Sequence, residues 1–140
     1  MIPGLLSTVE DHYHHTFVEC AEKHGYDWLL INYRGMRHPL KTTQPFSSFD
    51  YHTFEEVIID VIKQNQGKRQ IFIFGTSLGG HMTANLLANS TIDKNKEVAA
   101  VVALNPALDL NYSSHQLQQK FFGFYDWLFG ISLRIFMKQS

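Results

Sequence analysis

The chain has 140 residues, 44% of them hydrophobic, and a formal net charge of −1. This length fits one domain, and this apolar content is enough for a hydrophobic core. The balanced charge, without a Lys/Arg cluster, argues against nucleic acid as a partner. A single cysteine, Cys20, excludes an internal disulfide framework.

The apolar segments are short. Residues 1–6 lack the basic flank and the long apolar run of a signal peptide. No apolar run reaches the roughly 18 residues that a membrane span requires. The nearest, from Phe121 to Met137, is interrupted by Asp126 and Arg134. We therefore expect a cytoplasmic or membrane-associated protein, and the sequence does not decide between these locations.

The first predicted element is a helix that Ser7 or Thr8 caps and that ends near His24, before Gly25. Its inward positions, spaced i, i+3, i+4 and i+7, are His14, Phe17, Val18 and Ala21. His12, His14 and His15 lie close together, but no cysteine or carboxylate stands at ligand spacing with them. We interpret them as solvated or packing histidines and expect no metal or organic cofactor.

Asp27 to Tyr33 is nearly continuously apolar, as in a parallel strand that is buried on both faces. A long loop from Arg34 to about Asp50 follows. A second helix is predicted over residues 53–66, with Gly67 as its end.

The central pattern is an apolar run, Ile71 to Phe74, that leads directly into Gly75-Thr76-Ser77-Leu78-Gly79. A helix rich in Leu, Ala and Met is predicted from Leu78 to about Asn89. This order of strand, Gly-x-Ser-x-Gly and helix is the context of a nucleophile elbow, a sharp turn that exposes a reactive serine. Gly75 and Gly79 leave room for the turn, and the amide of Leu78 can face a developing oxyanion.

A further apolar strand is predicted from Val98 to Leu104. Strands that alternate with helices predict an open, mainly parallel α/β sheet. Such sheets place their sites beyond the C-terminal ends of the strands, where Ser77 would lie.

Residues 111–140 differ in character, since seven large apolar side chains crowd one predicted helix. They are Phe121, Phe122, Phe124, Tyr125, Trp127, Leu128 and Phe129. A core helix and a lid over a hydrophobic substrate explain them about equally well. Peripheral contact with a membrane is a weaker third interpretation, because the polar face lacks Lys/Arg enrichment.

Four stretches together resemble the α/β-hydrolase superfamily, in particular its YheT-like branch with the related "alpha/beta hydrolase domain-containing" (embryogenesis-associated) lipases. They are Pro3-Gly4-Leu5, His24-Gly25-Tyr26 through Asn32-Tyr33-Arg34-Gly35, Gly75-Thr76-Ser77-Leu78-Gly79-Gly80, and Asn105-Pro106-Ala107-Leu108-Asp109-Leu110. The chain departs from the family pattern at residues 36–39. The resemblance implies a partial α/β-hydrolase core over residues 1–110 and the beginning of a helical cap over residues 111–140.

By position, the resemblance makes Ser77 the nucleophile and the backbone amides of Leu5 and Leu78 the oxyanion hole. The implied activity is that of a serine hydrolase, a carboxylesterase or a lipase for acylglycerols or phospholipids, with a small acyl ester or lipid as substrate. Attack by Ser77 would form an acyl-enzyme that water then hydrolyses.

The resemblance also implies a triad acid and base that this sequence does not supply. In the superfamily the order is serine, acid, histidine. After Ser77 the only histidines are His81, one turn into the elbow helix and expected to pack or hydrogen-bond there, and His115. We therefore expect a fragment, truncated at both ends of the sheet and inactive alone. The alternative is a catalytically inactive α/β-hydrolase-like binding module. Oligomeric state is not predicted.

Overall fold

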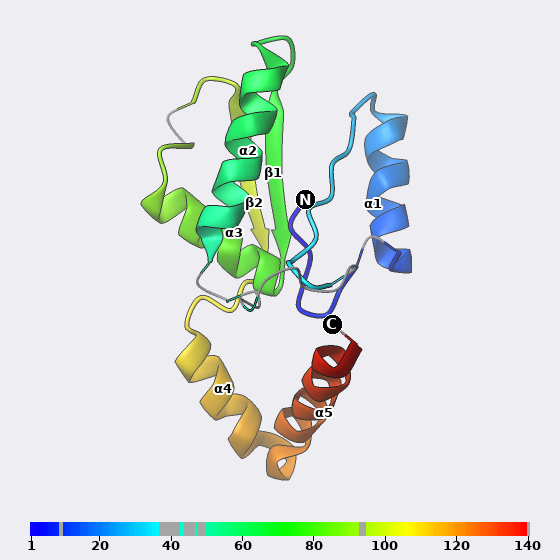
Figure 1. Cartoon of the computed structure of the whole chain (residues 1–140), viewed down its shortest axis with the longest axis vertical. Helices are drawn as coiled ribbons and strands as arrows, with labels where there is room; N and C mark the ends of the chain where they lie inside the picture. Colours follow the sequence, from blue (N-terminus) through cyan, green and yellow to red (C-terminus); the bar gives the residue numbers. More distant parts are fainter. Residues whose placement is uncertain (9, 37–42, 44–46, 48–49, 93–94, 140) are drawn as a thin grey trace.

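A computed structural model describes residues 1–8, 10–36, 43, 47, 50–92 and 95–139. In chain order the elements are α1 (His12–Lys23), α2 (Tyr51–Asn65), β1 (Ile71–Thr76), α3 (Leu78–Asn89), β2 (Val98–Leu104), α4 (Leu110–Gln119), the 3-10 helix η2 (Lys120–Gly123) and α5 (Phe124–Gln139). The strands β1 and β2 pair in parallel (Figure 1). The mixed α/β class is therefore confirmed, whereas the departure expected at residues 36–39 lies mostly outside the described residues.

Helices cover both faces of β1. Side chains alternate along a strand, so Phe74 and Ile73 point to opposite faces. Phe74 contacts Phe17 of α1, with 5.0 Å between the ring centroids. Ile73 is buried in the main core together with Phe54 of α2 and Met82 of α3. The strand is thus held between α1 on one side and the pair α2 and α3 on the other (Figure 1).

The parallel strand predicted from Asp27 to Tyr33 is not formed, and that prediction is wrong. The segment runs as an extended connection without strand assignment. The Met1 ammonium donates to the Leu29 carbonyl at 2.6 Å, and the Ile31 amide donates to the Met1 carbonyl at 3.0 Å. Both of these hydrogen bonds go to Met1. A single paired residue does not make a ladder of strand pairing, so no strand forms here. Leu29 is consequently 51% exposed.

Ile2 makes the matching contact with β1. Its amide donates to the Phe74 carbonyl at 2.8 Å, and its carbonyl accepts from the Thr76 amide at 3.1 Å. These bonds form a parallel bridge between Ile2 and Gly75, and the Ile2 side chain is 1% exposed. Met1 and Ile2 therefore lie between β1 and residues 29–31 and hydrogen-bond to both.

The first helix begins later than predicted, at His12 rather than after Ser7 or Thr8. Leu6 has a φ of 61°, which interrupts a right-handed helix before Asp11. Its end is as predicted. Gly25 has a φ of 75°, its amide donates to Glu22, and the Tyr26 amide donates to Ala21, which together form a Schellman motif.

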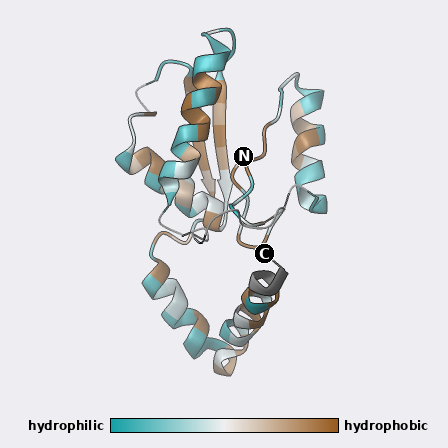
Figure 2. Ribbon diagram, viewed as in Figure 1, coloured by the Kyte–Doolittle hydropathy of each residue, from teal (hydrophilic) through white to brown (hydrophobic). Residues whose placement is uncertain are grey.

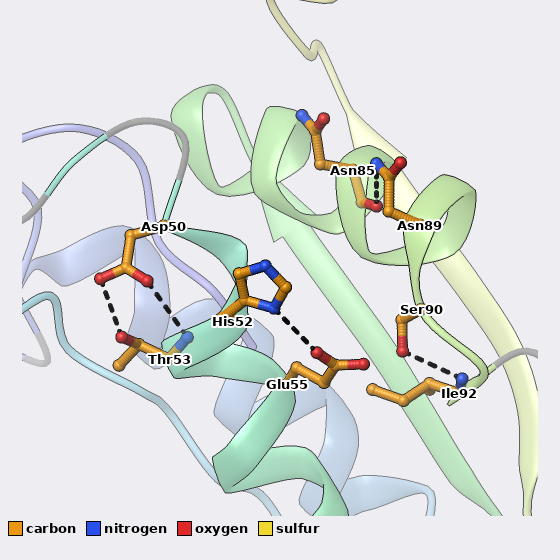
Figure 3. Close-up of polar contacts among 8 residues, drawn as sticks. All are labelled: Asp50, His52, Thr53, Glu55, Asn85, Asn89, Ser90 and Ile92. Atoms are coloured by element: carbon orange, nitrogen blue, oxygen red, sulfur yellow. Dashed lines mark hydrogen bonds and ion pairs between the residues drawn. The ribbon is translucent and has the colours of Figure 1, made fainter.

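Two helix ends meet beside the core, the start of α2 and the end of α3 (Figure 3). The Asp50 carboxylate caps α2 by accepting from the Thr53 amide at 3.4 Å and the Thr53 hydroxyl at 2.9 Å. The Ser90 hydroxyl and the His52 imidazole stand beside Glu55 and hold the pKa of that carboxyl below its usual range. These polar contacts fix the ends of the two helices that build the main core.

Residues 110–139 form an aromatic hairpin of α4, η2 and α5 that extends from the sheet (Figure 1). The single helix expected here is broken, because Phe121 and Phe122 have φ angles of 51° and 55°. Phe121 is 69% exposed and Trp127 is 60% exposed. No helix in the described ranges is long and apolar enough to cross a membrane.

Replacing Gly79 with alanine tests the tight packing at the centre of the fold. A Cβ atom on Gly79 would lie 2.1 Å from the Ile2 carbonyl oxygen, a backbone atom that cannot move aside cheaply. We expect Gly79→Ala to destabilise the chain by about 3 kcal/mol or more in urea unfolding. Gly130→Ala is the matched control, because a Cβ added there would meet nothing within 4 Å. Alanine favours a helix more than glycine does, so we expect the free energy of unfolding to rise by up to about 1 kcal/mol. Equal effects of the two changes would contradict this packing.

The buried Met1 ammonium should make the free energy of unfolding depend on pH. Burial lowers its pKa from 8.0 to about 6. Between these values the unfolded chain binds more protons than the folded chain, so the free energy of unfolding rises with pH. We expect a rise of about 1 to 2 kcal/mol from pH 6 to pH 8, after allowing for solvent access. N-terminal acetylation should remove this part of the slope, as measured by urea unfolding across that range. An unchanged slope would contradict the burial of the amine.

Candidate active site

Ser77 stands at a strained point between β1 and α3. Its backbone angles are φ 54° and ψ −116°, a region that non-glycine residues rarely adopt. The Ser77 amide donates to the Leu104 carbonyl of β2 at 2.9 Å, and its carbonyl accepts from the His81 amide at 3.0 Å. The side chain is exposed. The predicted strand, turn and helix are all present, and the turn presents the serine hydroxyl to solvent.

Steric crowding explains why positions 75 and 79 of the elbow are glycines. A Cβ on Gly75 would lie 2.2 Å from the Gly79 carbonyl oxygen and 2.2 Å from the Thr83 hydroxyl oxygen. A Cβ on Gly79 would meet the carbonyl oxygens of Ile2 and Pro3, at 2.1 and 2.4 Å. The backbones of β1, α3 and the N-terminal loop are therefore in contact beneath Ser77. Such a close approach leaves room only for glycine at positions 75 and 79.

The N-terminal loop reaches Ser77 through Gly4. A Cβ on Gly4 would lie 3.3 Å from the Ser77 Cβ and 3.9 Å from its Oγ. Leu5 follows directly and is half-buried. Across the turn, the buried Leu78 begins α3, and the first amides of a helix have no acceptor within the helix. The structure thus brings the loop that carries the Leu5 amide and the helix start that carries the Leu78 amide to the same serine.

The loop is anchored by Tyr33. Its hydroxyl donates to the Pro3 carbonyl at 2.9 Å, and the side chain is only 3% exposed. Burial raises the pKa of Tyr33, with a smaller contribution from Tyr13, so the hydroxyl stays protonated and remains a donor. The bond fixes the carbonyl that precedes Gly4, next to the serine.

A second anchor ties the other end of the loop to α1. The Ser7 hydroxyl donates to the Asp11 carboxylate at 2.5 Å and lies 2.6 Å from the Tyr13 hydroxyl and 3.5 Å from His14 Nε2. His14 is 2% exposed, and burial lowers its pKa. This histidine therefore packs as a neutral ring. In the described ranges no group of three His, Cys, Asp or Glu side chains could hold a metal ion.

His81 is a hydrogen-bonding residue of α3, as the sequence predicts. Its Nδ1 lies 2.7 Å from the Ala107 carbonyl oxygen and can only donate to it. The Asn85 amide lies 3.1 Å from Nε2, which is then an acceptor. Both ring nitrogens are engaged, and the ring ties the segment after β2 to α3. Among the described residues, no imidazole or carboxylate hydrogen-bonds to the Ser77 hydroxyl; His115 is exposed on α4.

Sequence reasoning misses two contributors to this site. Gly4 enters it only as part of the Pro-Gly-Leu motif, and its place opposite Ser77 depends on contacts between residues 73 positions apart. Tyr33 falls in a predicted buried strand, where a tyrosine needs no special role. The need of a buried tyrosine hydroxyl for a partner is the signal that could have indicated a polar contact.

The parallel strands and the serine elbow between β1 and α3 are features of one class of protein. The chain matches the alpha/beta hydrolase fold family over residues 1–131, and it belongs to that family. The resemblance inferred from the four motifs is thereby confirmed.

Similar curated proteins are named monoacylglycerol lipase ABHD2. The mouse (Mus musculus) and human (Homo sapiens) proteins are each 27% identical to this chain over 121 residues, as is one from zebrafish (Danio rerio). The match covers 85% of this chain and 27% of each of those proteins, so this chain spans about a quarter of their length. No solved structure matches significantly.

The strain at Ser77 can be measured by substitution. Ser77→Gly relieves a backbone conformation that costs on the order of 1–3 kcal/mol, and we expect it to raise the free energy of unfolding by about 1 kcal/mol. Ser77→Ala keeps the Cβ and hence the strain, so it should leave stability nearly unchanged. Urea unfolding of both variants gives the comparison, and a glycine variant no more stable than the alanine variant would contradict the strained geometry.

Proposed function

We propose that Ser77 is the nucleophile of a serine hydrolase that cleaves acyl esters. The single observation that carries this proposal is the exposed serine with φ 54° and ψ −116°, between strand β1 and helix α3. Natural proteins keep such strain where it serves a function, since a plain turn would use glycine at this point. Membership of the alpha/beta hydrolase fold family supports the same assignment.

In this proposal the amides of Leu5 and Leu78 stabilise the oxyanion that forms when Ser77 attacks the ester carbonyl. The proximity of Gly4 to Ser77 supports the first assignment, and the position of Leu78 at the start of α3 supports the second. The alcohol leaves with the proton that the Ser77 hydroxyl gave up to the base, an acyl-enzyme remains, and water releases the acid. The histidine base and the acid of the triad would come from outside these 140 residues, which is why the chain alone would be inactive.

The proposed substrate is an ester with a hydrophobic acyl chain, of the acylglycerol or phospholipid type. The aromatic hairpin supports this class, because its exposed rings offer apolar contact area near the end of the sheet. The related proteins named monoacylglycerol lipases point in the same direction. We propose that residues 1–110 act as core and residues 111–140 as the beginning of a lid, which could also touch a membrane surface.

A fluorophosphonate probe tests the function on the complete protein in which this segment occurs. The probe phosphonylates an activated serine, so we expect labelling of the wild type and loss of at least 95%, roughly a 20-fold decrease, in Ser77→Ala. Ser114→Ala, which changes an exposed serine of α4, is the matched control and should label normally. Absence of labelling in a folded wild-type protein would overturn the proposal and favour a binding module without catalysis.

A further inference from the structure

The amide of Leu5 belongs to a tight turn beside Ser77. The Ser7 amide donates to the Gly4 carbonyl at 3.2 Å, which closes a β-turn of four residues. Leu6, the third residue of this turn, has a φ of 61°, whereas Leu5 before it does not have a positive φ. A positive φ at the third residue alone is the mark of a type II turn. The loop opposite the serine therefore has a defined backbone conformation.

This turn decides where the Leu5 amide points. In a trans peptide unit the C=O and the N–H point in opposite directions. The Gly4 carbonyl is directed into the turn, toward the Ser7 amide, so the Leu5 N–H of the same peptide unit is directed out of it. Within the part of the chain that the structure describes, no backbone carbonyl accepts from the Leu5 amide. The turn thus leaves this donor available to an acceptor outside the loop.

The turn is also strained. Type II turns favour glycine or asparagine at the third residue, because other side chains crowd the backbone when φ is positive. Leucine at this position costs roughly 1–2 kcal/mol. Such a conformation persists only where contacts on both sides hold it. At the end of the loop the Ser7 hydroxyl provides one of these contacts, through its hydrogen bond to Asp11.

Tyr33 provides the contact at the start of the loop. Its hydroxyl donates to the Pro3 carbonyl at 2.9 Å, across 30 positions of sequence. Pro3 is fully buried, and a Cβ on Gly79 would lie 2.4 Å from its carbonyl oxygen. A buried carbonyl that loses its donor costs about 1–3 kcal/mol. The bond therefore favours one orientation of the peptide unit directly before Gly4.

The Tyr33 side chain is itself held in the hydrophobic core. Its ring meets Phe54 of α2 edge-on, with 5.2 Å between the centroids and 81° between the planes. Figure 2 shows how hydrophobic the neighbouring β1 and the middle of α2 are. Close packing restricts the ring, and burial raises the pKa of the hydroxyl and so keeps its proton in place. Tyr33 is therefore a fixed donor at neutral pH.

We propose that Tyr33 is a positioning residue of the oxyanion hole, which holds the turn after Pro3 so that the Leu5 amide faces the oxyanion. It acts through the Pro3 carbonyl rather than on the substrate. The inference rests on the proposed function, in which Ser77 is the nucleophile. Loss of the hydroxyl should therefore weaken binding of the transition state and leave binding of the substrate unchanged.

Tyr33→Phe tests this in the complete protein, because it removes the hydroxyl and keeps the ring against Phe54. Loss of a whole oxyanion donor lowers kcat by about 10²–10³, and a displaced donor costs less. We expect kcat for p-nitrophenyl butyrate to fall about tenfold and KM to change less than about twofold, per active serine titrated with the fluorophosphonate probe. Tyr26→Phe is the matched control, since Tyr26 is exposed and precedes the segment that Tyr33 ends, and its kinetics should equal those of the wild type.

A second measurement separates positioning from a loss of folded protein. Octyl trifluoromethyl ketone forms a hemiketal: the Ser77 oxygen bonds to the carbonyl carbon, its proton passes to the base, and the carbonyl oxygen becomes an oxyanion in the hole. We expect its Ki to rise about tenfold in Tyr33→Phe, as kcat falls. The corresponding alcohol cannot form a hemiketal and should inhibit both proteins equally. A smaller folded fraction would lower the rate and leave both Ki values unchanged.

A fluorinated tyrosine at position 33 serves if Tyr33→Phe does not fold. It keeps the ring and the hydroxyl but makes the hydroxyl more acidic. An ionised oxygen cannot donate to the Pro3 carbonyl, so kcat should fall on the alkaline side at a lower pH than in the wild type. The same replacement at position 26 should leave the pH profile unchanged.

The outcomes distinguish this inference from the proposed function. If folded Tyr33→Phe keeps the wild-type kcat and ketone Ki, Tyr33 does not position the hole, while Ser77 remains the nucleophile. A rise in KM with kcat unchanged would likewise overturn the inference, because it would place Tyr33 in substrate binding. A wild-type protein that the fluorophosphonate probe does not label would remove the proposed function and this inference together.

Discussion

The structure depends on one close approach of three backbone segments beneath Ser77. The carbonyls of Ile2 and Pro3 lie against Gly79, and the Gly79 carbonyl lies against Gly75. Side chains at either glycine would push strand, helix and loop apart by more than an ångström. Because the three segments touch, the ladder contact of Ile2 with β1 and the placement of Gly4 opposite the serine follow together.

This contact explains how the chain keeps a strained serine. A residue at φ 54° and ψ −116° persists only if its surroundings fix it from several sides. Here the Ser77 amide is bonded to β2, its carbonyl to α3, and the loop opposite is anchored through Tyr33. Met82 of α3, with 0% exposure, packs that helix into the main core. The position of the hydroxyl is therefore set by buried neighbours, independently of the exposed hairpin.

Local patterns predict the elements whose partners are close in sequence. Apolar runs and helix-end glycines indicate β1, α2, α3 and β2 within a few residues, because propensity and burial agree there. The segment 27–33 has the same apolar character but no strand, since a strand exists only with a partner along its length. The break at Phe121 and Phe122 adjoins Gly123, which also has a positive φ of 76°, but two consecutive phenylalanines with positive φ are not a turn pattern that a sequence indicates. The anchoring of the site by Tyr33 is a contact 30 residues apart that no local pattern contains.

Exposed apolar residues lie around this rigid centre rather than within it. Leu29 is exposed on the extended segment after α1, Phe72 on β1, and Val102 and Leu104 on β2, and the aromatic hairpin adds its own rings. Apolar side chains stabilise a protein only when they are removed from water. These exposed residues therefore add stability only where another surface covers them. The buried contacts beneath Ser77 therefore fix the geometry of the elbow, and the exposed apolar residues take no part in it. Changes at the exposed apolar residues should therefore leave this geometry in place, whereas side chains at Gly75 or Gly79 would remove it.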